Sequence, residues 1–307
     1  MACSPTGLLR TGFLYLTGIL ILSFFNFLLL ENAVLPALAG FVIGAFGTLI
    51  GAGGGFILVP LLLIFYPELS PEIVTAISMA VVSVNAVSGT VAYAKSGRID
   101  YKAGTTFALY TIPGSVLGVL VVQYIPLQLF NIIFGILLIV LSVYLFLRNK
   151  KDTSCNRITV NRPGYRQRRL TDAKGQVFEY AYNCVYGNMV SVAVGFISPV
   201  LGIGGGIIHV PAMVNWLKFP VHIATATSHF ILAVMATVSV AVHALQGSYS
   251  SEATVKMILL LALGIIPGAQ VGAYFSHKIK SHAILRLLSV CLLIVGMRIL
   301  YNSFTVH

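Results

Sequence analysis

Charged residues are scarce in this chain of 307 residues. Only 9% of the residues are Asp, Glu, Lys or Arg, and only eight are acidic, whereas 58% are hydrophobic. A water-facing surface normally needs about a quarter charged residues, so this composition excludes a soluble globular protein. The sequence therefore predicts an integral membrane protein.

Motifs for metal binding, disulfide bonds and hydrolysis are also missing. The four cysteines are scattered without a C-x-x-C pair, and the chain has no H-E-x-x-H or G-x-S-x-G motif. Ser228 and His229 come nearest to a nucleophile and base, but neighbouring helical residues point about 100° apart. We therefore expect no catalytic residues, no metal and no cofactor. The alternatives to a transporter are an intramembrane enzyme using Ser/His chemistry and a non-transporting membrane scaffold.

Apolar segments of membrane-spanning length fill most of the chain. A spanning helix needs ~20 apolar residues, and the sequence predicts seven full spans, at residues 11–31, 73–95, 103–123, 127–148, 222–246, 253–275 and 283–304. Residues 33–66 and 182–218 are too long for one span, and three consecutive glycines interrupt each of them. Glycine lowers helix propensity by roughly 1 kcal/mol per residue, so we expect two broken helical hairpins.

One sequence pattern occurs twice. Residues 51–60, GAGGGFILVP, return 151 positions later at residues 202–211 as GIGGGIIHVP, and the flanking Thr, Ser, Pro and Gly positions also align. The predicted fold is an all-α polytopic membrane protein with two inverted-topology repeats, each a glycine-broken hairpin followed by three transmembrane helices. Its predicted parts are an N-terminal transmembrane helix at 1–32, repeats at 33–148 and 182–307, and a basic loop at 149–181.

The basic residues orient this arrangement. Nine of the nineteen Lys and Arg lie between Arg148 and Lys174, which by the positive-inside rule places the central loop in the cytoplasm. Counting spans outward then places the N-terminus in the cytoplasm and gives the two repeats opposite orientations in the cell inner membrane. Inverted repeats with broken helices recur in secondary transporters, with the substrate at the repeat interface.

The net charge of +11 is explained by this orientation signal and by attraction to anionic membrane lipids, so we expect no nucleic-acid partner. Almost no acidic side chain lies at the centre of a span, which argues against transport of metal cations.

Residues 169–180 contain a turn-like Asp-Ala-Lys-Gly and predict a small hairpin. The first span resembles a secretory signal, but its length favours an uncleaved anchor. The sequence is compatible with a homodimer and carries no signal for one.

The paired glycine motifs resemble a known family. A G-x-G-G-G-F/I hairpin followed by proline, once per half and with Ser198-Pro199 before the second copy, is similar to the TauE/SafE sulfite exporters, also called the 4-toluene sulfonate uptake permease family. The resemblance covers roughly residues 33–304. It implies a permease for a small sulfur-containing anion of the sulfite, thiosulfate, sulfonate or sulfoacetate type.

The residues also suggest an anion site independently of that resemblance. Backbone N–H groups released ahead of a helix form an anion-binding nest at the positive end of the helix dipole. Two such nests are predicted, and together they would hold one anion near the membrane midplane; they are formed by Gly53, Gly54 and Gly55 and by Gly204, Gly205 and Gly206. The alternative is that the glycines only permit close helix packing.

Polar residues of the following helices add candidate hydrogen-bond donors. The predicted substrate-binding set is completed by Thr75, Ser78, Asn85, Thr227, Ser228, His229 and Gln270. Hydroxyl groups in membrane helices often bond to their own backbone instead. His209 and His229 are candidates for proton coupling because imidazole titrates near neutral pH, and packing is the alternative role of each.

Overall fold

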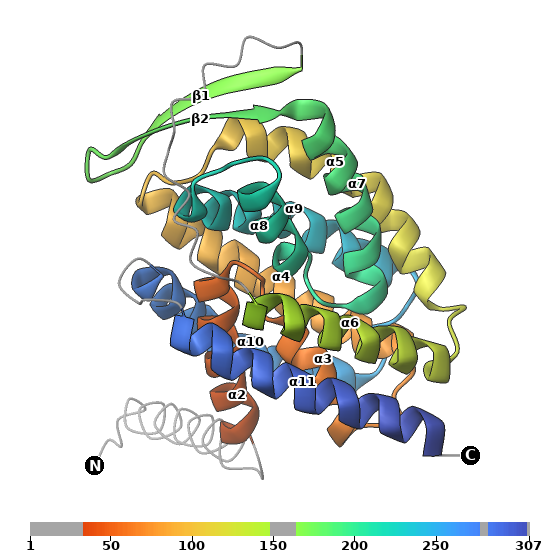
Figure 1. Ribbon diagram of the computed structural model, residues 1–307. Helices are drawn as coiled ribbons and strands as arrows, with labels where there is room; N and C mark the ends of the chain where they lie inside the picture. The colour runs from red at the N-terminus through yellow and green to blue at the C-terminus, as the bar shows by residue number, and fades with distance from the viewer. Residues whose placement is uncertain (1–32, 148–163, 277–281, 306–307) are drawn as a thin grey trace, which may run out of the picture.

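The structure of the chain, a computed structural model, describes residues 33–147, 164–276 and 282–305; the predicted span at 11–31 lies outside them. This part of the chain forms ten helices and one two-stranded hairpin (Figure 1). The first half comprises α2 (Val34–Ile50), α3 (Gly55–Phe65), α4 (Pro71–Lys95), α5 (Tyr101–Val122) and α6 (Leu127–Leu147). The second half comprises β1 (Tyr165–Thr171), β2 (Val177–Asn183), α7 (Cys184–Leu201), α8 (Gly206–Asn215), α9 (Val221–Leu245), α10 (Glu252–Phe275) and α11 (His282–Thr305).

These elements confirm the predicted helical, multi-pass fold. Six of the described helices are long and apolar enough to cross a membrane. Each predicted broken hairpin is a pair of helices, α2 with α3 and α7 with α8, of which α7 alone is among the six spans. The small hairpin predicted in the basic loop is also present, as β1 and β2 in antiparallel register.

Glycine conformation produces the two breaks. The first glycine turn, residues 51–54, and the second, residues 202–205, each contain three glycines with positive φ, a region that side chains disfavour. Gly51 ends α2 in the left-handed conformation, and Gly202 ends α7 in the same way, each donating its N–H to carbonyls of the preceding turn. This is the usual glycine C-cap of a helix. The helix therefore stops inside each long apolar segment and restarts at Gly55 and Gly206.

The helix contacts follow the repeat. If α2 to α6 are matched with α7 to α11 in order, the packing of α2 on α10 corresponds to that of α7 on α5, and the packing of α4 on α10 corresponds to that of α9 on α5. The pairs α4–α9 and α6–α11 join equivalent helices, and Figure 1 shows the latter two side by side. The two halves therefore interlock rather than lying next to each other as separate bundles.

Hydrogen bonds at both ends show that α4 and α9 are antiparallel. Just beyond the end of α4, the Asp100 N–H donates to Thr227 Oγ1 in the first turns of α9 at 3.0 Å. At the opposite end, Ser248, just beyond α9, donates its hydroxyl to Glu72 Oε1 in the first turn of α4 at 2.7 Å. The equivalent helices α4 and α9 therefore run in opposite directions.

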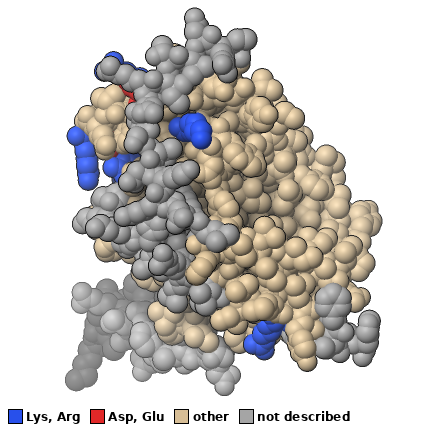
Figure 2. Space-filling model, viewed as in Figure 1, with Lys and Arg blue, Asp and Glu red and all other residues tan. Residues whose placement is uncertain are grey.

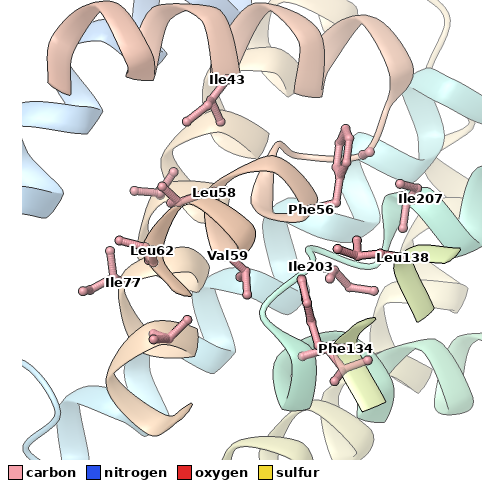
Figure 3. Packing of buried hydrophobic residues seen from close by; sticks show 14 of the residues in the cluster. Ile43, Phe56, Leu58, Val59, Leu62, Ile77, Phe134, Leu138, Ile203 and Ile207 are labelled. Carbon is pink, nitrogen blue, oxygen red and sulfur yellow. The ribbon is translucent and has the colours of Figure 1, made fainter. Parts of the chain in front are cut away.

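The largest apolar cluster surrounds the helices that follow the glycine turns. Phe56 and Val59 of α3 lie with Ile203 and Ile207 of the second half (Figure 3). Phe134 of α6 belongs to the same cluster. Because lipid tails are themselves apolar, such a cluster stabilises a membrane protein through close packing more than through removal from water. It fixes the positions of the two glycine turns.

The β1–β2 hairpin is attached to the loop between α4 and α5. Asp172 in its turn accepts hydrogen bonds from Arg98, with a closest distance of 3.1 Å. Tyr180 donates its hydroxyl to Asp100 at 2.7 Å, and Arg168 forms an ion pair with the same carboxylate at 3.3 Å. Burial, together with the neighbouring Asp100 carboxylate, raises the pKa of the Tyr180 phenol, which therefore stays a proton donor.

Aromatic packing attaches the same hairpin to the second half. The rings of Tyr180 and Tyr182 lie 4.6 and 5.0 Å from that of Phe219, which precedes α9, and Tyr182 also packs edge-on against Phe107 of α5. The hairpin therefore connects the two repeats at one end of the molecule. We call this end the hairpin end.

The described charges are concentrated at the ends of the molecule. Figure 2 shows a face that is mostly uncharged, with most of its Lys and Arg near the end at which Figure 1 draws β1 and β2. The described carboxylates of the hairpin end, Asp100, Asp172 and Glu179, each form an ion pair with an arginine. That end therefore has a basic surplus.

Candidate functional site

The two glycine turns contact each other through their backbones. A methyl group added at Gly55 would collide with the carbonyl oxygen of Gly202, and one added at Gly206 would collide with that of Gly51. Each contact is the counterpart of the other under the repeat. The packing interpretation therefore accounts for Gly55 and Gly206, where only hydrogen fits.

Several N–H groups of these turns have no hydrogen-bond acceptor in the described chain. In the first turn, Ala52 and Gly53 donate to Gly47, and Ile57 and Leu58 donate to Gly54. The N–H groups without an acceptor are those of Gly54, Gly55 and Phe56 and of Gly204, Gly205 and Ile207. The first N–H groups of a helix lack intrahelical acceptors and carry the positive end of its dipole. Each turn therefore presents free donors.

Gly47 of α2 packs closely against two donors, the Gly54 N–H of the first turn and the Asn85 amide of α4. A methyl group at Gly47 would lie 2.5 Å from the Gly54 nitrogen, 2.7 Å from the Gly54 Cα and 2.9 Å from Asn85 Nδ2. Asn85 is fully buried, and this nitrogen has no partner in the described chain. Thr48 donates to Asn85 Oδ1 at 2.9 Å, which turns the amide nitrogen toward Gly47. A buried amide donor without a protein partner is costly, so a bound water or ligand is expected beside it.

The second turn has a hydroxyl group at the corresponding place. Ser198, which matches Gly47 in the repeat, is fully buried, and its Oγ has no hydrogen-bond partner in the described chain. This oxygen lies 3.3 Å from where a methyl group at Gly205 would be. Met235 stands where the first half has Asn85. The two halves therefore offer different side-chain donors around equivalent turns.

Of the predicted residues, Ser78 contacts the second turn and His229 lies close to the Gly51 backbone of the first turn. Ser78 donates its hydroxyl to the Gly202 carbonyl at 2.5 Å, which joins α4 to the second turn. Ser228 and His229 are fully buried, and neither the hydroxyl nor either ring nitrogen makes a hydrogen bond of good geometry within the described chain. The Ser228–His229 pair thus forms no dyad in this arrangement. The His229 ring packs edge-on against Tyr93 of α4 at 5.6 Å.

The remaining predicted residues make other contacts. Thr75 donates to the Pro71 carbonyl of its own helix. Thr227 accepts from Asp100 near the hairpin end, and Gln270 donates to the carbonyl and hydroxyl of Ser88. His209 lies 3.3 Å from the Ser191 hydroxyl of α7, whereas His229 faces α4. Proton coupling through these two histidines stays a prediction.

Three residues beside the turns were not among the predicted donors: Gly47, Thr48 and Ser198. All three lie in the helices that precede the glycine triplets. In the sequence, Ser198-Pro199 stood out only as part of the family motif. The repeat offers the missing signal, because aligning the triplets aligns Gly47 with Ser198 six residues before Gly53 and Gly204.

This arrangement of paired glycine turns in a multi-pass helical chain agrees with a comparison of the sequence with known families. Residues 36–299 match the family described as sulfite exporter TauE/SafE. The chain belongs to this family. As a TauE/SafE protein, it is a multi-pass membrane protein of a transporter family.

Curated relatives carry names of the same kind. A probable membrane transporter protein of Bacillus subtilis, YunE, is 30% identical over 88% of this chain and 98% of its own length. A probable membrane transporter protein of Methanocaldococcus jannaschii is 26% identical over 89% of this chain and 96% of its own length. No solved structure matches the chain.

Proposed function

We propose that this TauE/SafE protein is a secondary transporter that moves a small sulfur-containing anion, of the sulfite, thiosulfate, sulfonate or sulfoacetate type, across the membrane. The anion is held by donors at the glycine turns. One observation carries this proposal: the Gly54 N–H and the Asn85 amide nitrogen, both without a partner in the described chain, both lie next to Gly47. The family description supplies the sulfur chemistry.

The chemistry of the turns suits such a ligand. Oxyanions accept several hydrogen bonds, and the free N–H groups, the Asn85 amide and the Ser198 and Ser228 hydroxyls supply donors without a buried formal charge. A neutral site also releases its anion more readily than an Arg or Lys site would, because no strong ion pair has to be broken. This favours a carrier over a storage site.

The antiparallel course of α4 and α9 supports inverted-topology repeats, and the basic surplus of the hairpin end supports a cytoplasmic location for the β1–β2 hairpin in the inner membrane. We expect a membrane-impermeant thiol reagent, added outside intact cells, to modify a cysteine placed at Glu252 and to spare one placed at Lys174. Modification at Lys174 and not at Glu252 would reverse the proposed orientation.

Anion binding by the purified protein tests the function. We expect sulfite, thiosulfate or a sulfonate to raise the thermal unfolding temperature of the parent, because a ligand that binds only the folded state stabilises it. Asn85→Met installs the residue that the second half has at this position. It should weaken affinity by roughly 10- to 150-fold, since a hydrogen bond to a charged group contributes about 1.5–3 kcal/mol.

Asn131→Met is the matched control. Asn131 lies on α6, and its amide oxygen also lacks a partner in the described chain, but it belongs to neither glycine turn. Its replacement should leave anion affinity unchanged. A parent protein that no sulfur anion stabilises would contradict the proposed function, and equal affinities of the parent and Asn85→Met would contradict the proposed site.

A further inference from the structure

A second feature that can receive anions is a cavity of about 300 Å³ at the hairpin end, between the last turns of α4 and α10. We call it the vestibule. Ser96 and Lys95 of the α4 end and Ser276 of the α10 end line it. Arg98, from the loop between α4 and α5, also lines it. None of these residues belongs to the glycine turns.

The charge of the vestibule is positive. Lys95 is exposed and forms no ion pair with any described residue, while Arg98 is held by Asp172. The carboxylates described at this end are already neutralised by arginines, so none of them is left to repel an anion. A concave surface with uncompensated positive charge raises the local concentration of anions.

The inner wall of the vestibule leads toward the candidate site. Tyr93 lines the cavity, and its hydroxyl donates to the Thr48 carbonyl at 2.9 Å. Thr48 in turn orients Asn85. Asn85 and Tyr93 are eight residues apart on α4, which corresponds to about 12 Å along the helix. Tyr93 therefore stands between the cavity and the unpartnered donors, with His229 packed against its ring.

We propose that the vestibule is the entry and exit site for anions at the hairpin end and that Tyr93 is the gate between it and the glycine turns. This inference rests on the proposed function. In the arrangement described here the gate is closed, because the Tyr93–Thr48 hydrogen bond holds the ring in place. Opening requires that this bond break and that the ring leave the path beside His229.

Accessibility of a cysteine behind the gate tests the proposal. Thr48→Cys, made after the native cysteines are replaced, places a thiol of similar size directly behind Tyr93. The probe is a sulfonate-bearing methanethiosulfonate reagent, which is itself a small sulfur anion. Ala92→Cys, in the wall of the vestibule, is the positive control and should react quickly whether position 93 is Tyr, Phe or Ala.

We expect Thr48→Cys to react slowly when Tyr93 is present and at least tenfold faster in Tyr93→Ala. Tyr93→Phe, which removes the hydroxyl group with its hydrogen bonds and preserves the packing of the ring, should give an intermediate rate. It covers the case in which the alanine variant does not fold. Lys95→Glu should slow the reaction of Ala92→Cys at low salt and not at high salt, whereas Lys102→Glu, outside the cavity, should not.

If the thiol of Thr48→Cys is modified at the same rate with Tyr, Phe or Ala at position 93, Tyr93 is not a gate. If Lys95→Glu and Lys102→Glu change the labelling of Ala92→Cys equally, the vestibule does not attract the anion. The rise in the unfolding temperature of Tyr93→Phe on addition of sulfur anions tests anion binding separately from the gate. If the anions still stabilise the protein but the labelling rates do not change, the proposed function is retained and the role of Tyr93 as a gate is contradicted.

Discussion

Gly47→Ala should abolish or strongly weaken anion binding although it adds only one methyl group. Gly47 lies inside α2 with helical geometry, where alanine is normally favoured over glycine by roughly 0.5–1 kcal/mol. The new carbon would nevertheless lie 2.5 Å from the Gly54 nitrogen and 2.9 Å from Asn85 Nδ2. It would force the first turn and Asn85 to shift, so that the two donors could no longer bind the anion together. With both hydrogen bonds lost, we expect affinity to fall by roughly a hundredfold or more.

Gly44→Ala is the matched control, one turn earlier on the same helix. Its methyl group would lie 2.7 Å from the Ile265 carbonyl oxygen of α10, so it overpacks the α2–α10 contact to a similar degree without reaching the donors. Gly44→Ala should lower the unfolding temperature and leave the anion-dependent rise intact in the folded protein. If the two variants lose stability alike and Gly47→Ala binds the anion as the parent does, Gly47 is a packing residue only.

Asp172→Asn should weaken the attachment of the β1–β2 hairpin to the membrane helices, and so should acid. Burial acts to raise the pKa of the Asp172 carboxyl, but hydrogen bonds from the Gln176 N–H, from Arg98 and from the Lys174 N–H outweigh it, so that the pKa lies below its ordinary value. The charged form therefore stabilises docking. The loss of its charge-assisted bonds should weaken docking by roughly 1.5–3 kcal/mol.

The sign of the pH effect follows from this lowered pKa. An undocked aspartate titrates near about 3.9, so the stabilisation is complete above that pH and is lost as the pH falls through the lower pKa of the docked hairpin. Hydrogen exchange of residues 165–183, corrected for its intrinsic pH dependence, measures the docking. Asp172→Asn should remove the acid sensitivity that this group contributes.

Glu179→Gln is the control for the hairpin experiment. The Glu179–Arg169 pair lies on the same hairpin, but both side chains are largely exposed, at 48% and 73%. Exposed pairs of this kind contribute roughly 0–1 kcal/mol. Glu179→Gln should therefore leave the hydrogen exchange of residues 165–183 nearly unchanged. An effect as large as that of Asp172→Asn would show that the Arg98–Asp172 contact has no special role in docking.

The sequence was sufficient for the fold because its signals are local. Membrane helices follow from runs of apolar residues, and the breaks follow from glycines that cannot continue a helix, so that α2 to α3 and α7 to α8 could be placed to within a few residues. The hairpin was also predictable from its turn residues. None of these predictions needed knowledge of which helices touch.

The candidate site was harder to predict because free donors are defined by distant contacts. Thr75 and Ser78 are similar hydroxyl residues three positions apart, yet one bonds to its own helix and the other crosses to Gly202. Gly47 has no side chain to attract notice, and its role depends on the position of α2 against the first turn and α4. Such a register is a tertiary property that residue type and spacing do not encode.

The most direct test of the central claim is the position of a bound anion. Selenite is a heavier analogue of sulfite and scatters X-rays anomalously, so crystals of the protein soaked in it report the selenium position. We predict an anomalous peak at the glycine turns, with anion oxygens about 2.7–3.2 Å from the Gly54 nitrogen and Asn85 Nδ2, and excess sulfite should remove it. A peak confined to the vestibule beside Lys95, with none at the turns, would contradict the account.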